Sequence, residues 1–304
     1  MLDAALLGTG GMMPLPDRWL TSLLLRLNGR MILLDCGEGT QITAKLLGWG
    51  FKNIDAILIT HFHADHISGL PGMLLAIGNS DRTEPLTIIG PKGLERVVTG
   101  LRTIAPELPY EVILKEIDTN FFETEIIGLK VKALRLNHRI TCYGYSFELP
   151  RKGKFSPERA KENDIPLKYW SRLQKEDSVV TDEGRLLTSD MVLGPDRKGL
   201  KLCYTTDTRP TAEIPDFIRG ADLFICEGMY SDPEKLSSLK EKKHMLFSEA
   251  AALAKAGEVK EMWLTHYSPA LMNPRAEVGE ARKIFPNTKA AKDRFHTTLK
   301  FIDE

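Results

Sequence analysis

The chain has 304 residues, of which 42% are hydrophobic and 27% are charged, enough for one large core or two smaller ones. Its 41 basic and 41 acidic residues cancel, so no overall positive field attracts a nucleic acid, and such a partner would have to meet a local patch. No stretch approaches the roughly 18 apolar residues of a spanning helix, and the N-terminus has no secretory pattern, so we expect a cytoplasmic protein without membrane contact.

Apolar runs and turn signals alternate along the chain and indicate an α/β protein. In the first half, strands are expected over 22–27, 30–35, 55–60, 86–90, 110–117, 129–136 and 142–149, with helices over 39–50, after His66 and over 93–105. Asn28-Gly29, between the first two strands, is the dipeptide best suited to a two-residue hairpin turn. In the second half, we expect strands over 200–206, 221–227, 261–266 and 298–302 and helices over 211–220, 247–257 and 274–285. This order suggests two packed sheets with helices outside.

The segment 150–199 is polar and rich in proline and glycine, and we interpret it as an inserted flexible arm in a single domain spanning 1–304. From Arg151 to Lys175 it has eight basic and three acidic residues, a net charge of +5, with three aromatic residues among them. This mixture suits contacts with phosphates and stacked bases, although an amphipathic segment with ordinary surface lysines would look similar. The candidate substrate contacts on the arm are Lys152, Lys154, Tyr169, Trp170 and Arg172.

Six apolar, strand-like runs end on a residue that can bind a metal ion or act as an acid or base. These residues are Asp35, His61, His138, Asp207, Glu227 and His266. If the strands belong to two facing sheets, their carboxyl ends can converge on one edge, where open sheets tend to bind ligands. By contrast, the four cysteines are widely separated and form no CxxC pair, which favours buried, reduced thiols.

The densest part of this pattern is HFHADH, residues 61–66, directly after an apolar strand. His61 and His63 are two residues apart in an extended segment, so both can face one metal ion, and Asp65 and His66 can face a second. Imidazole nitrogen and carboxylate oxygen are the normal zinc ligands, and iron or manganese would accept the same set. We therefore predict a site for two metal ions.

Four groups cannot complete two metal sites, so further ligands must come from other strands. His138 can complete the first site, His266 can complete the second, and Asp207 can bridge them. Taken alone, such a histidine is more often a packing residue and such an aspartate a turn or cap residue. Two divalent ions, two carboxylates and one hydroxide leave a formal charge of about +1, which matches a phosphodiester but does not exclude lactams or thioesters.

The stretch THFHADHISGLPGML, residues 60–74, resembles the HxHxDH signature of the metallo-β-lactamase fold. Its continuation resembles the ribonuclease Z branch, the endonucleases that process the 3′ end of tRNA. LLDCGEGTQ (33–41), NHRITCYGYSFE (137–148), TDTRP (206–210) and LTHYSP (264–269) are similar to further motifs of this branch and fall in its order. The resemblance extends over about residues 6–269 and implies an αββα sandwich with two zinc ions at one edge, usually as a homodimer.

The resemblance also implies a role for individual residues. The implied ligands are His61, His63 and His138 for one metal, Asp65, His66 and His266 for the other, and Asp207 as the bridge. Asp65 also matches the residue that handles the proton of the nucleophile. His244 matches the histidine that protonates the leaving 3′ oxygen, and Glu227 the glutamate that holds it. By itself, His244 at the end of the basic run LKEKKH also fits a solvent-exposed histidine.

Three departures from the family's pattern concern substrate selection rather than metal chemistry. The N-terminal loop Pro-x-Lys-x-Arg-Asn reads PLPDRW here, residues 14–19, so Arg18 matches, as a candidate substrate contact, and Trp19 replaces the asparagine. The arm reads IPLKYWSRLQ, residues 165–174, where the family has a Gly-Pro element. CEGM, residues 226–229, keeps only the glutamate of the usual His-Glu-Ala-Thr.

Three hypotheses follow. The leading one is a zinc-dependent endoribonuclease that cleaves precursor tRNA after the discriminator base and leaves a 3′ hydroxyl. The second keeps the hydrolase but changes the substrate to another phosphodiester or a sulfate ester, which the altered loop and arm favour. The third is a catalytically retired metal- and RNA-binding protein, and the combination of Asp65, Glu227 and His244 argues against it because such a protein would need none of them.

Overall fold

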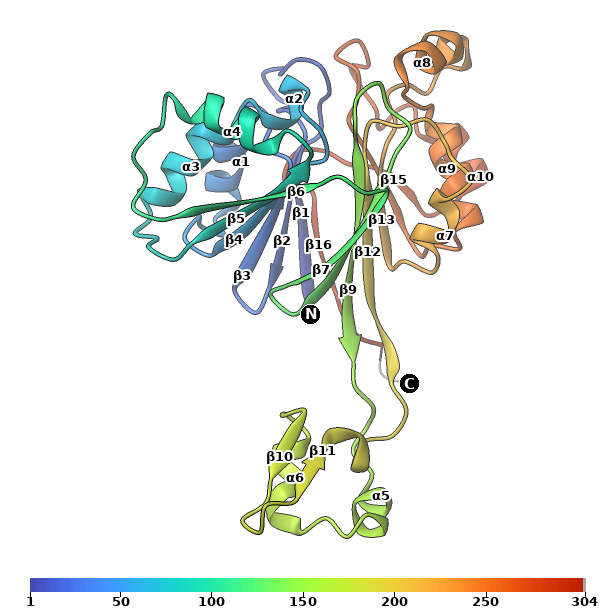
Figure 1. The fold of residues 1–304 in the computed structure, drawn as a ribbon. Coiled ribbons are helices and arrows are strands. Elements are labelled where there is room, and N and C mark those ends of the chain that lie inside the picture. The colour runs from blue at the N-terminus through green and yellow to red at the C-terminus, as the bar shows by residue number, and fades with distance from the viewer. Residues whose placement is uncertain (303–304) are drawn as a thin grey trace. The chain divides into compact units, whose positions relative to one another are not determined.

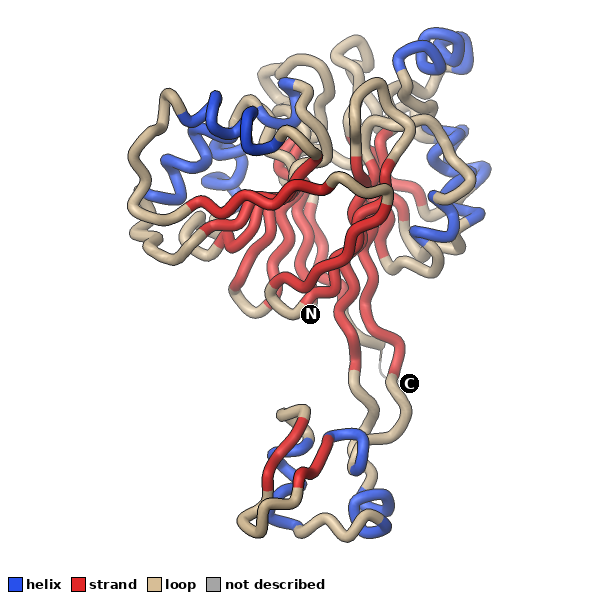
Figure 2. Tube along the Cα trace, viewed as in Figure 1, coloured by secondary structure: helices blue, strands red, loops and turns tan. Residues whose placement is uncertain are grey.

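The computed structural model describes residues 1–302. The chain divides into two compact units, which are considered separately below (Figures 1 and 2). Unit 1 is formed by residues 1–148 together with the chain from 201 onward, and unit 2 by residues 149–200. Within residues 1–302, no helix combines the length and the apolar character needed to cross a membrane.

Two seven-stranded sheets form the frame of unit 1 (Figure 1). The strand order of the first sheet is β16 (His296–Leu299), β1 (Leu2–Gly8), β2 (Ser22–Leu27), β3 (Arg30–Leu34), β4 (Ile54–Leu58), β5 (Leu86–Pro91) and β6 (Val112–Ile117). That of the second is β15 (Thr288–Ala290), β14 (Met262–Thr265), β13 (Leu223–Glu227), β12 (Arg197–Thr205), β9 (Tyr143–Arg151), β8 (Leu129–Arg135) and β7 (Phe121–Ile126).

Helices cover the outer face of each sheet (Figure 1). The first sheet carries α1 (Thr40–Leu47), α2 (Ala64–Ile67), α3 (Leu70–Gly78) and α4 (Leu94–Arg102). The second carries α7 (Ile214–Ile218), α9 (Phe247–Ala256) and α10 (Gly279–Ile284). The 3₁₀ helix η2 (Pro233–Lys235) and α8 (Leu236–Lys242) lie beyond the end of this sheet, where Leu239 packs with Met229 and Leu246. A separate apolar cluster lies between each sheet and its helices. The predicted αββα layering is therefore confirmed.

Parallel pairing brings the carboxyl ends of the strands to one edge. In the first sheet β3, β4, β5 and β6 are parallel neighbours, and in the second β12, β13, β14 and β15 are. Buried contacts join the two sheets near this edge: the hydroxyl of Tyr145 on β9 donates to the carbonyl of Ile59 after β4 at 2.8 Å. The predicted convergence of strand ends follows from this arrangement.

The hairpin at Asn28-Gly29 is confirmed. β2 and β3 pair with Leu27 opposite Arg30, and Asn28 and Gly29 have φ angles of 50° and 80°, as a type I′ turn requires. The helices predicted over 211–220 and 274–285 are shorter in the structure, at Ile214–Ile218 and Gly279–Ile284. The strands β1, β7 and β15 were not predicted; β7 pairs on one side only, and its residues alternate between exposed and half-buried.

Unit 2 has secondary structure and a core of its own. Its elements are α5 (Pro157–Glu162), α6 (Leu167–Leu173), β10 (Ser178–Val180), β11 (Leu186–Thr188) and the 3₁₀ helix η1 (Ser189–Met191). Eight buried side chains, among them Ile165, Leu173 and Leu187, pack together inside it. The unit begins and ends on adjacent chain segments, because a Cβ added to Gly199 would lie 2.3 Å from the carbonyl oxygen of Leu149.

Two glycine substitutions test the turn assignment. Gly29→Ala should lower the free energy of unfolding by about 1 kcal/mol, because the positive φ of this position is strained for alanine. No atom lies within 4 Å of the added Cβ, so a clash would not contribute. Gly100→Ala, in the exposed part of α4 with equally open surroundings, should raise it by about 0.5–1 kcal/mol. Urea unfolding measures both changes. A loss at both positions would contradict the backbone explanation.

Candidate metal centre and active site

The candidate site lies beyond the carboxyl ends of the strands of both sheets in unit 1. His61 and His63 follow β4, and Asp65 and His66 lie on the single turn of α2 that begins after His63. Asp35 after β3 and His266 after β14 have left-handed φ angles of 53° and 57°. Such angles in non-glycine residues cluster at functional sites, since surrounding contacts must hold them there.

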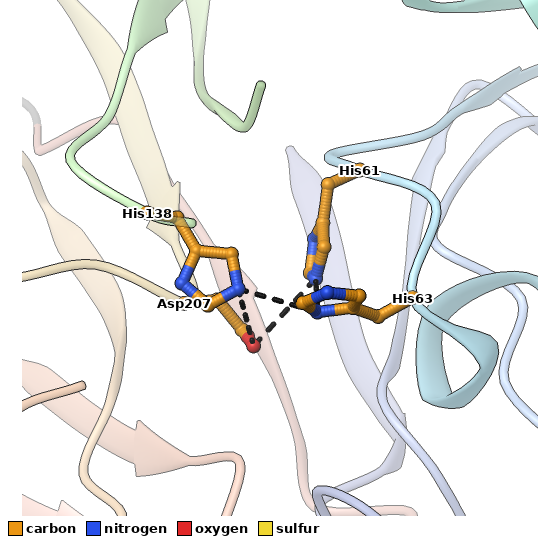
Figure 3. Close-up of side chains that lie close together, drawn as sticks. All are labelled: His61, His63, His138 and Asp207. Carbon is orange, nitrogen blue, oxygen red and sulfur yellow. Dashed lines mark hydrogen bonds and ion pairs between the residues drawn. The ribbon is translucent and has the colours of Figure 1, made fainter. Parts of the chain in front are cut away.

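The first group consists of His61, His63, His138 and Asp207 (Figure 3). Nε2 of His61 lies 3.0 Å from Nδ1 of His63, which lies 3.2 Å from Nε2 of His138. Oδ2 of Asp207 is 3.6 Å from His61 Nε2 and 3.7 Å from His138 Nε2. The four side chains come from three separate chain segments and point toward one another. One ion could contact all four.

The second group consists of Asp65, His66 and His266, with Asp207 at its side. Nε2 of His66 and Nε2 of His266 are 3.2 Å apart, and the latter lies 3.3 Å from Oδ2 of Asp65. Oδ1 of Asp207 is 3.2 Å from His66 Nε2 and 3.1 Å from His266 Nε2. Asp207 therefore faces the first group with Oδ2 and the second with Oδ1, as a bridging carboxylate would.

The spacing of these atoms fits metal ions. Four ligand atoms about 2.0–2.1 Å from one ion in a tetrahedron lie about 3.3 Å from one another. Within the two groups, the contacts given above run from 3.0 to 3.7 Å. Burial lowers the pKa of His61 well below its usual value, with the neighbouring His66 adding to the effect, and burial lowers that of His138 to about 4. Neutral imidazoles at His61 and His138 offer the lone pairs that a cation in the first group needs.

Neighbouring groups fix the direction of the imidazoles. Nδ1 of His66 contacts Oδ2 of Asp35 at 2.8 Å, and Asp35 also accepts the backbone N–H and hydroxyl of Thr60. Nδ1 of His138 contacts the carbonyl of Lys243 at 3.3 Å. Both contacts favour the tautomer whose Nε2 lone pair faces the group. His266 differs, since its buried Nδ1 has no hydrogen-bond partner among the described residues.

His244 and Glu227 lie next to the two groups. Glu227 ends β13 and is fully buried, and its Oε2 contacts Nδ1 of His244 at 3.1 Å. The ring of His244 stacks on that of His266, with 5.5 Å between centroids. Burial lowers the pKa of His244, but the charge and hydrogen bond of Glu227 outweigh it and raise the pKa to about 9. His244 is therefore a charged, largely buried imidazolium and not a solvent-exposed residue.

The N-terminal loop after β1 packs against this site. A Cβ added to Gly11 would lie 2.6 Å from the ring of His266, and the N–H of Met12 donates to Oδ2 of Asp65 at 2.6 Å. Arg18 donates to the carbonyls of Ser268 and Met272, so its guanidinium ties the N-terminal loop to the loop after His266. Gly11 belongs to the stretch LGTGG, residues 7–11, which resembles a further motif of the family, but sequence reasoning assigned no role to Gly11 or Met12, because contacts through backbone atoms do not show in residue types.

In unit 2, the predicted substrate contacts have different environments. Tyr169 is buried in the core, and its hydroxyl accepts the N–H of Asp182, while the half-buried Trp170 donates to the carbonyl of Ile165. Lys154 is exposed. Lys152 pairs with Asp177, and Arg172 pairs with Glu176.

The ring of Tyr169 is therefore structural, and the exposed charges are partly compensated. Over 149–200, eleven basic and nine acidic residues leave a net charge of +2, less than the +5 of residues 151–175.

The chain is similar over its full length to proteins named ribonuclease Z. It is 57% identical to ribonuclease Z of Lachnoclostridium phytofermentans over 302 residues, covering 99% of each chain, and 56% identical to ribonuclease Z of Lachnospira eligens over the full length of both. A family model described as anti-Pycsar protein Apyc1 matches residues 2–149.

Solved structures show the same fold. Human tRNase Z, short form, aligns with a TM-score of 0.71 and 24% identity, covering 98% of this chain and all of the other. The metallo-β-lactamase-fold protein YhfI of Bacillus subtilis aligns with a TM-score of 0.67 and 20% identity, covering 97% and 98%. Given the identity of more than half its residues to full-length relatives, the chain belongs to the ribonuclease Z family.

Proposed function

We propose that this protein is a metal-dependent endoribonuclease that removes 3′ trailers from precursor tRNA and leaves a 3′ hydroxyl. The observation that carries the proposal is the pair of groups joined by Asp207, with His244 and Glu227 beside them. The relative at 57% identity is named ribonuclease Z, and this name supports both the proposed reaction and the proposed RNA substrate. We further propose two zinc ions as the natural cofactor, with manganese or iron as substitutes, and a cytoplasmic homodimer as the working form.

Different residues act on the attacking water and on the leaving 3′ oxygen. Two divalent ions, held by His61, His63, His138, Asp207, Asp65, His66 and His266, would activate water and stabilise the charge that develops on the phosphate. Asp65, oriented by the N–H of Met12, takes up the proton of the attacking water. His244, protonated because of Glu227, donates a proton from Nε2 to the leaving 3′ oxygen.

Trailer removal is the direct test. The zinc-loaded protein should convert a precursor tRNA with a 3′ extension to a product ending in a 3′ hydroxyl, and dialysis against a chelator should abolish this until metal is restored. Asp65→Ala should lower kcat by at least about 10³-fold without unfolding the protein, as circular dichroism would show. Full activity of this variant would contradict the assigned role.

The same assay separates the alternatives. Hydrolysis of bis(p-nitrophenyl) phosphate without cleavage of precursor tRNA would favour a hydrolase of another phosphodiester or a sulfate ester. RNA binding without turnover of either substrate would favour the catalytically retired protein.

Glu227→Gln should shift the pH dependence of tRNA cleavage. His244 donates its proton only while protonated, so activity falls as the pH rises through its pKa of about 9. Removing the negative partner lowers this pKa, and the alkaline limb of the kcat profile should move to lower pH. Hydrolysis of bis(p-nitrophenyl) phosphate is the control, because nitrophenolate leaves without a proton. An unchanged limb for tRNA would contradict the pairing.

Unit 2 is proposed as an RNA-binding exosite. Because Leu149 and Gly199 lie side by side, residues 150–199 can be replaced by an Asn-Gly turn between β9 and β12. This excision should raise KM for precursor tRNA about tenfold or more, with the larger loss at low salt. The kcat/KM for bis(p-nitrophenyl) phosphate should stay within about twofold of the intact protein. Equal losses on both substrates would refute the exosite.

A further inference from the structure

The chain segment that carries His244 is held through its backbone by His138, a residue of the proposed metal site, and by Arg209. The carbonyl of Lys243 contacts Nδ1 of His138 at 3.3 Å, and the carbonyl of His244 accepts a hydrogen bond from Nη1 of Arg209 at 2.6 Å. Lys243 has a left-handed φ of 65°, which ends α8 and turns the chain into the site. His244 lies between α8 and α9, and its N–H donates to the carbonyl of Leu239 on α8 at 2.9 Å, so its backbone is held by α8 on one side and by Arg209 on the other.

Arg209 makes the most extensive of these contacts. Its Nη1 also donates to Oε2 of Glu249 at 2.8 Å, and its Nη2 pairs with Oε1 of the same carboxylate. The side chain of Arg209 is only 13% exposed. Oε2 of Glu249 in turn accepts the N–H of Leu246 at the start of α9. The planar guanidinium thus lies between a backbone carbonyl and a carboxylate, a geometry that a lysine cannot reproduce.

Three consecutive residues, Asp207, Thr208 and Arg209, connect the two metal groups to His244, the proposed proton donor. Asp207 faces both metal groups with its two oxygens, and the N–H of Thr208 donates to Oε1 of Glu227, whose other oxygen contacts His244. Arg209 then holds the carbonyl of His244, and its own N–H donates to the carbonyl of Asn137, next to His138. A shift of His244 relative to Asp207 would break contacts at each of these points.

We propose that Arg209 is a positioning residue, which places His244 so that its Nε2 meets the leaving oxygen. This inference rests on the proposed function. The contact with Glu227 orients the ring through Nδ1 alone, so the location of Nε2 also depends on where the backbone of residue 244 lies. Without the guanidinium, the carbonyl of His244 loses its donor and the segment can move. Proton donation tolerates little displacement, because a shift of about 1 Å can cost about 10²-fold in rate.

The prediction is a loss that depends on the leaving group. Arg209→Ala and Arg209→Lys should each lower kcat for precursor tRNA by about 30–100-fold, with KM within about threefold. For bis(p-nitrophenyl) phosphate, whose leaving group needs no proton, kcat should fall by less than about threefold. Wild-type activity in Arg209→Lys, or equal losses on both substrates, would overturn the inference.

A double variant separates positioning from stability. If Arg209 acts through His244, then Arg209→Ala should cause no further loss of tRNA cleavage in a His244→Ala background. Multiplication of the two losses would instead show that Arg209 acts independently. Arg26→Ala is the control for removing an arginine from an ion pair away from the site, because Arg26 pairs with Asp3 on the first sheet, and it should alter neither substrate's kcat.

Two further measurements keep the test decisive. If Arg209→Ala does not fold, Glu249→Gln weakens the ion pair while retaining an acceptor for the N–H of Leu246, and a smaller loss confined to tRNA is expected. If the wild type fails to cleave tRNA, the proposed function is wrong. Thymidine 5′-aryl phosphates with progressively poorer leaving groups then test Arg209 alone: the loss should grow along the series, and a uniform loss would refute the inference.

Discussion

Four buried carboxylates, those of Asp35, Asp65, Asp207 and Glu227, lie among the histidines, and the whole arrangement depends on compensating their charge. An isolated carboxylate in a protein interior costs several kcal/mol unless positive or hydrogen-bonding groups surround it. Burial raises the pKa of Asp207, but the nearby His266 and His66 outweigh this and hold the pKa well below its usual value. The histidines that compensate this charge follow strands of both sheets, so these strands have to end at the same edge.

The sequence predicted the site well where a residue able to bind a metal ion stands at the end of a recognisable strand. HFHADH follows an apolar strand, and single histidines or acids end five others. Parallel pairing of β12, β13 and β14 brings Asp207 and His266 to one edge of the second sheet, whereas His138 follows the antiparallel strand β8, and packing of the two sheets brings these residues to His61. The Asn-Gly turn was equally predictable, because few dipeptides adopt two positive φ angles in succession. Asp35 was recognised as a strand end, but its bond to Nδ1 of His66 depends on how β3 and β4 are placed side by side.

Other features had no signature in the sequence. The rings of Tyr169 and Trp170 were interpreted as a surface for stacking, yet a 52-residue unit needs apolar side chains for its own core, and Tyr169 is one of them. The basic residues before Lys175 gained acidic partners from the following segment, which a count over one window could not include. Arg209 was visible only as part of a motif, since its acceptor is a backbone carbonyl 35 residues away.

The position of Cys142 affects which donor atoms the proposed site offers to a metal ion. Its Sγ lies 3.8 Å from Nδ1 of His61, on the side of the ring opposite the proposed metal, and burial raises its pKa well above the usual value. This position, beyond Nδ1 and away from Nε2, places the thiol outside the first group of ligand atoms. The donor set therefore consists of imidazole nitrogens and carboxylate oxygens, which gives soft ions such as Cu(I) no thiolate to bind.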